Sequence, residues 1–491
     1  MLKHGGSDIY NVKELREDYS VTTNFLGPSL NGIKQMTSNI YQINHYPSED
    51  KKFFQEGLDF LGVDESNVMW GNGASELIDL VIRTLVKLNG YSTYSKFNHV
   101  QYMEYERCCL SNGLVEKPNG EILLIINPNN PTGDFYRKDD IKKQINQLAS
   151  GSTVIIDESM CFWYGPDWHT QSFLSESNYI ETLKSNKNVN MILVQSWTKI
   201  FSCTGLRFGS VVCFDANLIK QFEKYKTPWS ANILSYYYLK GCIADKNYLE
   251  ETWKQTPVLR KQIESKILEL FPFAEVKGHE FLSWLWVDFK FPEIADAIYL
   301  KSLEYGIPVR HGKSGYVQPT HIRFAVRCAQ SNNILFAMLA NVKLNKIKVP
   351  EYYFGLPENL VYGIIKIPLD KIKSHEEHIV ERKSKLLEYL NGNDYFVLPS
   401  MIVDSKNFVI LDGHHRLNIL KELGKQEEYV LLVNYESESI IPHETNNVTK
   451  MEIIQAGLTE KLLPAKSSKH IFIDLEGNKR PLISLSVIVN S

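Results

Sequence analysis

The chain lacks the features that mark secreted, membrane-spanning and nucleic-acid-binding proteins. Its 491 residues include seven cysteines, none in a CxxC pair or at a spacing typical of disulfide frameworks. No apolar run approaches the roughly 18 residues of a membrane span, and the opening MLKHGGSDIY has no apolar signal core. The formal net charge of −3 leaves no strongly basic half. These absences predict a reduced, cytoplasmic protein with neither nucleic acid nor membrane as partner.

The composition is that of a large globular protein with more than one domain. The chain is 43% hydrophobic and 23% charged, which allows a sizeable core, and its length predicts two or three domains. All cysteines precede residue 330, whereas residues 346–360 mix lysine, proline and aromatic side chains as linkers do. We therefore predict a first domain over residues 1–345, a linker over 346–360 and a second domain over 361–491.

Alternating strand and helix patterns in the first domain predict an α/β fold. The apolar segments 121–128, 152–159 and 188–196 are typical of buried strands, and helical or linking segments separate them. This rhythm predicts a mostly parallel sheet with its site at the carboxyl edge. A glycine-rich turn, GNGAS, leads into a helix predicted from about Ser75 to Leu88. Such a turn can close around a phosphate, although a simple helix cap at Ser75 is the alternative.

The stretch SWTKIFSCTGLRFG follows the third predicted strand and suggests a cofactor. Lys199 lies among small and hydroxyl residues, and Arg207 follows it. A lysine that attacks an aldehyde needs a nearly dry pocket, where desolvation and neighbouring positive charge lower its pKa. Ser196, Thr198 and Arg207 offer donors suited to a phosphate monoester. The stretch predicts pyridoxal phosphate bound covalently to Lys199, with an ordinary surface lysine as the alternative.

Polar residues also follow the other two strands. Asn130 lies in NPNNPTG and Asp157 in IIDES. A carboxylate beside a pyridine nitrogen keeps that nitrogen protonated and makes the ring an electron sink, and an amide can tune the ring's phenolic oxygen. Either Tyr102 or Tyr105 could stack on the ring, although most tyrosines are simply half-buried.

The segment after residue 250 brings fixed positive charge. Residues 257–271 predict a long helix, and two arginine-bearing segments, GIPVRHGKSGY and HIRFAVR, follow it. Arg310, Arg323 and Arg327 would suit a substrate that carries both a carboxylate and a phosphate. Arginine alternates with apolar residues in HIRFAVR, which favours one strand face lining a site over a solvated surface.

The second domain carries its own polar motif, DGHHR, where an apolar strand turns into a helix. Its carboxylate, two histidines and arginine converge at a predicted helix N-terminus, which suggests a nucleotide-phosphate and Mg²⁺ site. A zinc site ranks lower, because the histidines are adjacent and no cysteine accompanies them.

Residues 1 to about 345 resemble the fold-type I pyridoxal-phosphate enzymes, most closely histidinol-phosphate aminotransferase and threonine-phosphate decarboxylase. The resemblance rests on HGGSDIY, NFLGPS, GNGASELI and the motifs around the residues above, in the same order. It implies a large and a small domain, and a homodimer in which Tyr46 reaches the neighbouring subunit's cofactor. The cofactor-binding residues that it implies are Tyr46, Gly73, Ala74, Ser75, Tyr102, Asn130, Asp157, Ser196, Lys199 and Arg207. The substrate-binding residues that it implies are His4, Gly27, Arg310, Arg323 and Arg327, with Arg323 at the carboxylate.

Two departures from the aminotransferase pattern favour decarboxylation. Met160, in DESM, replaces the tyrosine of the usual DEAY, and the decarboxylases also tend to lack that tyrosine. Val326 and Arg327 stand where aminotransferases often have Val-Gly.

Residues 361–491 resemble free-serine kinases of the ParB/sulfiredoxin-like α+β fold, through KIKSHE, ILDGHHR and AKSSKH. By this resemblance Glu376 acts on the serine hydroxyl and Asp412 is a second catalytic carboxylate. The nucleotide and substrate contacts that it implies are Asp412, Gly413, His414, His415, Arg416, Lys466, Ser467, Ser468 and His470. Lys469 stands where the family often has arginine, and the domain lacks the cysteine that sulfiredoxin chemistry needs.

Together these motifs predict a bifunctional enzyme. The second domain would use ATP or ADP with Mg²⁺ to phosphorylate free L-serine. The first would decarboxylate the resulting O-phospho-L-serine to ethanolamine phosphate. One alternative is the threonine pair of reactions, which gives aminopropanol phosphate. Another is a pyridoxal-phosphate aminotransferase acting on a phosphorylated keto substrate, with a regulatory nucleotide-binding tail.

Overall fold

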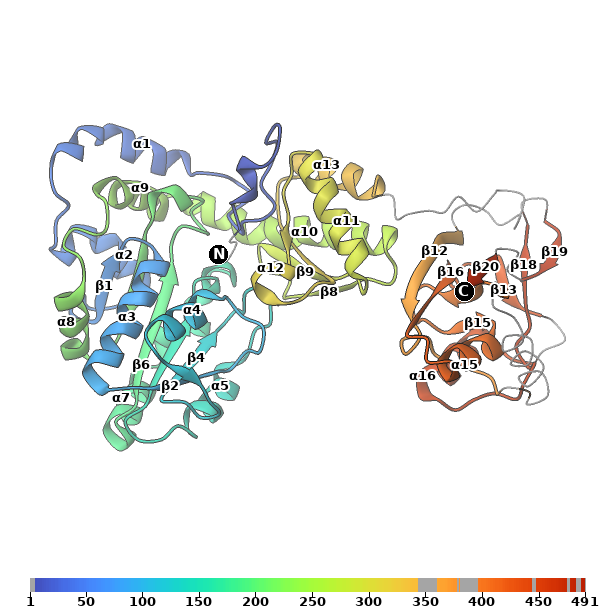
Figure 1. Cartoon of the computed structure of the whole chain (residues 1–491). Helices are drawn as coiled ribbons and strands as arrows, with labels where there is room; N and C mark the ends of the chain where they lie inside the picture. Colours follow the sequence, from blue (N-terminus) through green and yellow to red (C-terminus); the bar gives the residue numbers. More distant parts are fainter. Residues whose placement is uncertain are drawn as a thin grey trace. The chain divides into compact units, whose positions relative to one another are not determined.

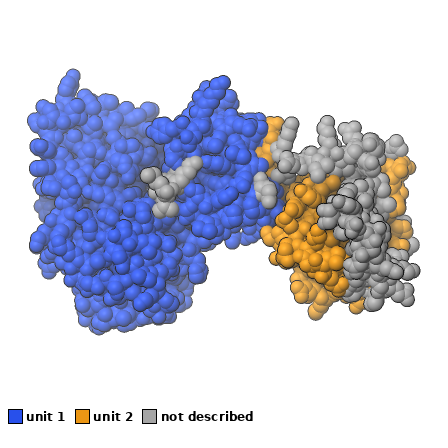
Figure 2. Space-filling model, viewed as in Figure 1, with its two compact units in different colours: residues 1–267, 275–340 blue, residues 268–274, 341–491 orange. Residues whose placement is uncertain are grey.

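The structure is a computed structural model that describes residues 5–342, 360–377, 379, 396–443, 447–474, 477–482 and 487–490. The chain divides into two compact units (Figure 2). The first comprises residues 1–267 and 275–340, and the second comprises 268–274 and 341–491. The predicted linker, apart from Leu360, lies outside the described residues.

A seven-stranded sheet forms the centre of the first unit (Figure 1), with strand order β1-β7-β6-β5-β4-β2-β3. Its strands are β1 (Val68–Gly71), β2 (Thr93–Lys96), β3 (Val115–Glu116), β4 (Ile122–Ile126), β5 (Thr153–Asp157), β6 (Asn190–Ser196) and β7 (Gly209–Val212). Only β7 runs antiparallel to its neighbours, β1 and β6, and the other pairs are parallel. The predicted mostly parallel α/β sheet is confirmed, and its three predicted strands are β4, β5 and β6.

Both faces of this sheet are buried, because the side chains of its central strands alternate between two hydrophobic clusters. Leu123 and Val154 belong to one cluster, whereas Leu124 and Ile155 belong to the other. The helices before residue 341 are α1 (Leu30–Ser38), α2 (Gln55–Leu61), α3 (Ala74–Asn89), α4 (Glu104–Ser111), α5 (Lys138–Ile145), α6 (Trp168–Gln171), α7 (Ser177–Lys187), α8 (Ala216–Tyr225), α9 (Ile233–Ala244), α10 (Lys246–Leu270), α11 (Pro292–Glu304), α12 (Lys313–Tyr316) and α13 (Ala329–Ala340). The short 3-10 helices are η1 (Asp8–Tyr10), η2 (Ile40–Asn44), η3 (Lys51–Phe54), η4 (Glu65–Asn67), η5 (Cys161–Trp163), η6 (Phe173–Ser175) and η7 (Thr204–Leu206).

The predicted helix over 257–271 is part of a longer helix, α10, which begins at Lys246 and contains Pro257. The sequence pattern favours a start at the proline, since proline suits the first turn of a helix. The earlier turns form because Tyr248, Leu249 and Thr252 are buried against the rest of the unit. Packing therefore outweighs the cost of an internal proline.

A small antiparallel sheet completes the first unit, with strand order β10-β11-β9-β8. Its strands are β8 (Glu275–Lys277), β9 (Trp284–Asp288), β10 (Arg310–His311) and β11 (His321–Ala325). The register places Arg310 directly opposite Arg323. Two of the three predicted substrate arginines are thus cross-strand neighbours, whereas Arg327 lies beyond the end of β11.

The second unit combines strands and helices. A four-stranded sheet has the order β12-β16-β14-β15, in which only β14 and β16 are parallel. Its elements are β12 (Val361–Pro368), β13 (Phe396–Pro399), β14 (Met401–Asp404), β15 (Ile410–Asp412), α15 (His414–Glu422), β16 (Glu427–Val433), β17 (Ile440–Pro442), α16 (Lys450–Thr459), β18 (His470–Ile473), β19 (Lys479–Pro481) and β20 (Val487–Asn490). Strand β13 pairs with β20, and β17, β18 and β19 form a third sheet. The likeness to a ParB/sulfiredoxin-like fold stays a prediction.

The composition predicts reduced cysteines and no membrane-spanning segment. All seven cysteines are free thiols, and six of them are buried. None of the described helices is both long enough and apolar enough to cross a lipid bilayer.

Candidate active site

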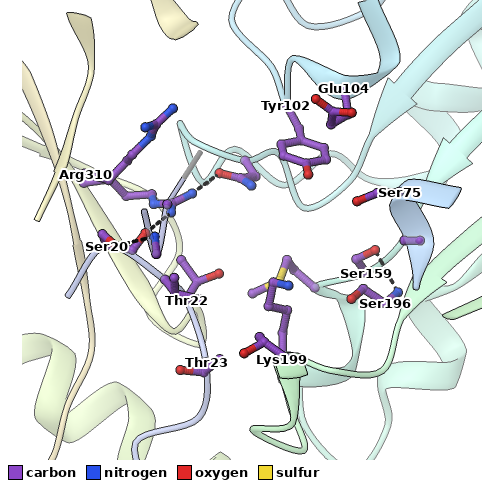
Figure 3. Close-up of a pocket in the computed structure, with 18 of the residues that line it drawn as sticks. Ser20, Thr22, Thr23, Ser75, Tyr102, Glu104, Ser159, Ser196, Lys199 and Arg310 are labelled. Carbon is purple, nitrogen blue, oxygen red and sulfur yellow. Dashed lines mark hydrogen bonds between the residues drawn. The ribbon is translucent and has the colours of Figure 1, made fainter. Parts of the chain in front are cut away.

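A cavity of about 630 Å³ lies where the loops after β4, β5 and β6 meet the small sheet and the N-terminal segment. In Figure 3, Ser20, Thr22 and Thr23 lie on one side of the cavity, and Ser75, Ser159 and Ser196 lie on the other. The register of the parallel strands aligns Ile126, Asp157 and Val194. The segments that leave these strands therefore emerge at one edge of the sheet, where α/β proteins place their sites.

Lys199 follows β6 and lines this cavity, with its Nζ 3.4 Å from Thr198 Oγ1. Desolvation lowers the pKa of Lys199 to about 8, and the positive charges of Arg207 and Arg323 act in the same direction. Cys203 and Asp157 oppose this shift. A substantial fraction of the amine is therefore neutral near physiological pH, as nucleophilic attack on an aldehyde requires.

Asp157 ends β5 as a buried carboxylate whose two oxygens both accept hydrogen bonds. Tyr105 Oη donates to Oδ2 over 2.8 Å, and the Ser159 backbone N–H donates to Oδ1 over 2.8 Å. Burial raises the pKa of Asp157, and these hydrogen bonds and the Lys199 charge offset only part of that increase. The donors hold the carboxylate in one orientation at the cavity wall.

The two tyrosines that the sequence offers for ring stacking have different positions. Tyr102 lines the cavity, and its hydroxyl is hydrogen-bonded to Ser75. Tyr105 is 1% exposed and lies against Asp157. Tyr105 lies in the first turn of α4 and supports the carboxylate, a contact that no local sequence pattern indicates.

A cradle for an anion lies where β1 turns into α3. Gly73 has φ +83°, and a Cβ there would lie 2.6 Å from Arg207 Nη2. Gly209 is equally confined, since its Cβ would lie 2.6 Å from the Ala74 backbone nitrogen. Ala74, Ser75, Ser196 and Arg207 all line the cavity. A helix N-terminus, hydroxyls and a guanidinium together suit a phosphate monoester, so these residues fit the phosphate of the predicted pyridoxal phosphate.

A second concentration of positive charge lies on the small sheet. Arg310 is 4% exposed and Arg323 is 5% exposed, and both line the cavity. Arg323 Nη1 donates to Asn130 Oδ1, and its Nη2 donates to the Ser20 carbonyl over 2.6 Å. Arg310 donates to the Ser314 carbonyl over 2.9 Å. The side-chain oxygen of Asn130 accepts from Arg323, so the group that Asn130 can offer to a ligand is its amide NH₂, a donor.

Four of the predicted substrate and cofactor residues that the structure describes do not line this cavity: Gly27, Tyr46, Gly73 and Arg327. Gly27 lies outside the lining, and its carbonyl accepts a hydrogen bond from Tyr248 over 2.7 Å. Arg327 also lies outside it, because β11 ends at Ala325 and the strand alternation stops before it. Neither Gly27 nor Arg327 is part of the cavity lining, and their predicted substrate contacts stay predictions. Tyr46 is 76% exposed and stacks on Trp229, with 4.4 Å between ring centroids, and its reach to a second subunit stays a prediction.

His4 lies outside the described residues. The two glycines that follow it, Gly5 and Gly6, line the cavity. The Gly6 backbone N–H donates to Ser20 Oγ over 2.8 Å.

In the second unit, Glu376 is joined to the turn that carries Lys466 and Ser468. Its carboxylate accepts from the backbone N–H of Lys466 over 3.0 Å and of Ser468 over 2.6 Å, and also from the Ser468 hydroxyl. The hydroxyl is further bonded to His375 Nε2. Of the predicted kinase residues, the structure therefore brings Glu376 and Ser468 into direct contact. The Ser467 hydroxyl oxygen is buried without a partner among the described residues.

Buried histidines surround that contact. His414 Nε2 lies 3.2 Å from His375 Nδ1, and His470 Nε2 lies 2.7 Å from Tyr435 Oη. Burial lowers the pKa of His375 to about 4 and that of His470 to about 3, and it lowers the pKa of His414 as well. These side chains are therefore neutral near pH 7.

The DGHHR motif spans the end of β15 and the start of α15, as predicted. Gly413 takes φ +109° between the two elements. Asp412 forms an ion pair with Arg416, and Arg416 donates to the Ser400 carbonyl over 2.9 Å. His415 Nε2 accepts from the Ile379 backbone N–H over 3.0 Å. No group of three or more His, Cys, Asp or Glu side chains among the described residues is arranged to hold a metal ion.

Comparisons with known proteins concern the greater part of the chain. The family described as aminotransferase class I and II matches residues 33–337. Histidinol-phosphate aminotransferase 1 of Psychrobacter arcticus is 22% identical over 363 residues, covering 67% of this chain and 90% of the relative. The histidinol-phosphate aminotransferase of Bacillus velezensis is 24% identical over 327 residues, covering 62% and 85%.

Solved structures show the same fold. The histidinol-phosphate aminotransferase of Clostridium acetobutylicum superposes with a TM-score of 0.58 at 22% identity, covering 67% of this chain and 99% of that one. The L-threonine-O-3-phosphate decarboxylase of Porphyromonas gingivalis superposes with a TM-score of 0.55 at 18% identity, covering 66% and 98%.

The lowered pKa of Lys199 predicts how the apoprotein captures pyridoxal phosphate. The amine is protonated and unreactive below its pKa, so the rate of covalent capture should rise about tenfold from pH 7 to pH 9 and level off above that. Stopped-flow absorbance of the bound cofactor measures this rate, and borohydride reduction followed by peptide mass spectrometry identifies the lysine. Lys199→Met is the control and should show no capture phase. A rate that keeps rising steeply beyond pH 9 would indicate an ordinary, solvated lysine.

The hydrogen bond between Tyr105 and Asp157 predicts a role in holding the cofactor. Tyr105→Phe removes a donor that keeps the carboxylate ionised and oriented, so the affinity for pyridoxal phosphate should fall about tenfold, with a larger loss at acidic pH. Equilibrium titration of the apoprotein measures this affinity. Tyr91→Phe is a matched control, because Tyr91 bonds to Thr153 at the other end of β5. Equal losses in both variants would refute the specific role of Tyr105.

Proposed function

Because the chain belongs to the aminotransferase class I and II family, we propose that its first unit uses pyridoxal phosphate to decarboxylate O-phospho-L-serine to ethanolamine phosphate. The observation that carries this proposal is the pair of buried arginines, Arg310 and Arg323, in the same cavity as Lys199. A buried guanidinium needs a counter-charge, and an amino acid phosphate brings both a carboxylate and a phosphate.

The cofactor would take its place through residues that already converge on the cavity. Ala74, Ser75, Ser196 and Arg207 would hold its phosphate, and Lys199 would bind its aldehyde carbon. Tyr102 would lie against its ring. When bound, pyridoxal phosphate supplies an electron sink for the electron pair left at the substrate's Cα.

Asp157 and Asn130 would tune that sink from the two edges of the ring. The Asp157 carboxylate, held by Tyr105 and Ser159, would keep the pyridine nitrogen protonated. Asn130 would donate its amide N–H to the phenolic oxygen, since its own oxygen accepts from Arg323.

The arginines would orient the substrate. Arg323, held by Ser20 and Asn130, would bind the carboxylate, and Arg310 would bind the phosphate. Once carbon dioxide has left, Cα needs a proton. Lys199 is suited to donate it, because a pKa near neutrality allows the same amine to take up and release a proton. Met160 lines the cavity with a thioether, which offers no donor where a tyrosine would.

Two other reactions have support of their own. Decarboxylation of threonine phosphate is supported by the fold shared with the L-threonine-O-3-phosphate decarboxylase. Aminotransfer onto a phosphorylated keto substrate is supported by the curated relatives, which are named histidinol-phosphate aminotransferases. Both would use Lys199 and the two arginines.

The second unit is proposed to supply the substrate by phosphorylating L-serine. Glu376 would remove the proton of the serine hydroxyl, and Asp412 with Mg²⁺ would position the phosphate of ATP or ADP. Mg²⁺ usually retains several waters and takes only one or two carboxylates alongside the nucleotide phosphates, so no dedicated cage of protein ligands is required. His414, His415 and Arg416 would lie at the phosphates. The remaining contacts proposed for serine or phosphate are Gly413, Lys466, Ser467, Ser468 and His470.

A homodimer is proposed for the first unit. Apolar side chains from α1 to the loop after η2 are exposed, with Leu30 at 81%, Tyr41 at 87% and Ile43 at 63%. Tyr46 follows them in the chain, where it would reach the cofactor phosphate of a second copy. Large exposed apolar side chains that gather in one segment favour a protein interface there.

The decarboxylase proposal predicts release of carbon dioxide without an acceptor. Holoprotein incubated with O-phospho-L-serine and no 2-oxo acid should form ethanolamine phosphate and carbon dioxide in equal amounts, measured by mass spectrometry and coupled carbonate detection. Arg310→Lys should lower kcat/KM on the order of 10- to 100-fold, because a bidentate contact to an anion becomes a single one. Turnover that requires a 2-oxo acid and yields a keto product would favour the aminotransferase instead.

Two independent sites predict that two variants separate the activities. Glu376→Gln should reduce formation of phosphoserine from serine and nucleotide by at least about 100-fold, because a general base is lost, and should leave decarboxylation of added phosphoserine unchanged. Lys199→Ala should show the opposite pattern. Glu377→Gln is the neighbouring control, since Glu377 is exposed. Undiminished phosphorylation in Glu376→Gln, or none in the unaltered protein, would contradict the kinase assignment.

A further inference from the structure

One wall of the cavity is a short segment that precedes α1. Of its residues, Asp18, Ser20, Val21, Thr22 and Thr23 line the cavity. We propose that Arg327 is a positioning residue that fixes this wall, residues 18–23, and thereby sets substrate affinity without touching the substrate. The predicted effect on substrate affinity rests on the function proposed above. The effect on the wall itself rests only on the contacts of Arg327.

The guanidinium of Arg327 binds the backbone of this segment at three places. Its Nε donates to the Asp18 carbonyl over 3.1 Å, its Nη1 donates to the Thr23 carbonyl over 2.8 Å, and its Nη2 donates to the Val21 carbonyl over 2.6 Å. Arg327 is 4% exposed. The five donors of a guanidinium lie on three nitrogen atoms in a rigid plane, so they can reach carbonyls that are spread apart, whereas the three donors of an ammonium group share one nitrogen.

The charge of Arg327 is also already balanced. Its Nε lies 3.2 Å from Glu17 Oε1, immediately before the wall in the chain. Glu17 is held in turn, since its Oε2 accepts from the Ser331 hydroxyl over 2.9 Å. Arg327 therefore needs no substrate anion as a counter-charge, unlike the arginines that line the cavity.

The wall connects the two groups that the proposed reaction uses. Arg323 donates to the Ser20 carbonyl over 2.6 Å, which orients this guanidinium at the cavity. The Asn24 backbone N–H, just after the wall, donates to the Lys199 carbonyl over 3.1 Å. A displacement of residues 18–23 would therefore alter the position of Arg323 and the distance between Arg323 and Lys199.

The wall also supports the glycine segment near the start of the chain. The Gly6 N–H donates to Ser20 Oγ, and a Cβ at Gly5 would lie only 2.5 Å from the Ser20 carbonyl oxygen. The glycines can pack this closely only while Ser20 keeps its position. Arg327 thus supports two segments that line the cavity: the wall directly, and Gly5 and Gly6 through Ser20.

The test compares Arg327→Lys with Arg260→Lys. Arg260 is a matched control, because it is equally buried and donates to the carbonyls of Lys277, Gly278 and Trp284, none of which lines the cavity. Arg327→Lys should raise the KM for O-phospho-L-serine about 10- to 100-fold with less than about threefold change in kcat, because charge-assisted hydrogen bonds that hold the wall are lost. Hydrogen exchange at the amides of residues 19–24 should accelerate at least about tenfold. Arg260→Lys should change neither quantity, and equal effects in both variants would overturn the proposal.

Direct substrate binding by Arg327 is distinguished by ligands that carry one anionic group. Ethanolamine phosphate lacks the carboxylate, and L-serine lacks the phosphate. A displaced wall should weaken both ligands by similar factors in calorimetric titrations of the holoprotein. A penalty confined to one of them, with hydrogen exchange of residues 19–24 unchanged, would show direct contact and overturn the positioning role.

Glu17→Gln provides a milder variant in case Arg327→Lys does not fold. It removes the ion pair but leaves the arginine in place, so exchange at residues 19–24 should accelerate at least about threefold, and unchanged exchange would overturn the proposal. Hydrogen exchange requires no turnover. If phosphoserine releases no carbon dioxide but exchange rises as expected and ethanolamine phosphate binds more weakly, the proposed decarboxylation fails and the role of Arg327 stands.

Discussion

The arrangement of the first unit depends on positive charge that is gathered in one cavity. Lys199, Arg207, Arg310 and Arg323 line it together, and Arg310, Arg323 and the Asp157 carboxylate are buried. Removing such charges from water costs several kcal/mol each unless oxygen atoms surround them. Backbone carbonyls satisfy part of each guanidinium, as Ser20 and Ser314 do here. Bound anions can satisfy the rest, which is why this cavity suits one phosphate at Arg207 and further anionic groups at the small sheet.

Strand register explains how residues so distant in the chain meet. The parallel strands β4, β5 and β6 end at the same edge of the sheet. Asp157 ends β5 there, and Asn130 and Lys199 follow β4 and β6. The sheet is buried on both faces, and its edge is therefore a rigid support for a lysine whose pKa depends on desolvation. The buried sheet thus accounts both for the position of the Lys199 amine and for the desolvation that makes it reactive.

Sequence patterns could predict those parts of the site that belong to regular elements. The strands, the Gly73 turn and Lys199 with its phosphate donors follow from periodicity and residue chemistry, and the fold is confirmed. The contacts of Arg327 and Gly27 do not follow from local patterns, because their partners come from distant segments: Arg327 donates to residues 18–23, and the Gly27 carbonyl accepts from Tyr248. Tyr105 was not recognised because its partner, Asp157, lies on another strand. No local pattern records which distant carbonyl or carboxylate a buried donor will reach.

In the second unit, the carboxylate proposed as a base is already tethered by hydrogen bonds. Glu376 accepts two backbone N–H groups and the Ser468 hydroxyl. The two N–H bonds hold the carboxylate in one orientation. The third partner is a serine hydroxyl, chemically the same group as that of the proposed substrate, L-serine. A substrate hydroxyl could therefore replace that of Ser468 at Glu376 without any change in the number of hydrogen bonds to the carboxylate. His375, kept neutral by burial, is already bonded to Ser468 and could retain the displaced hydroxyl.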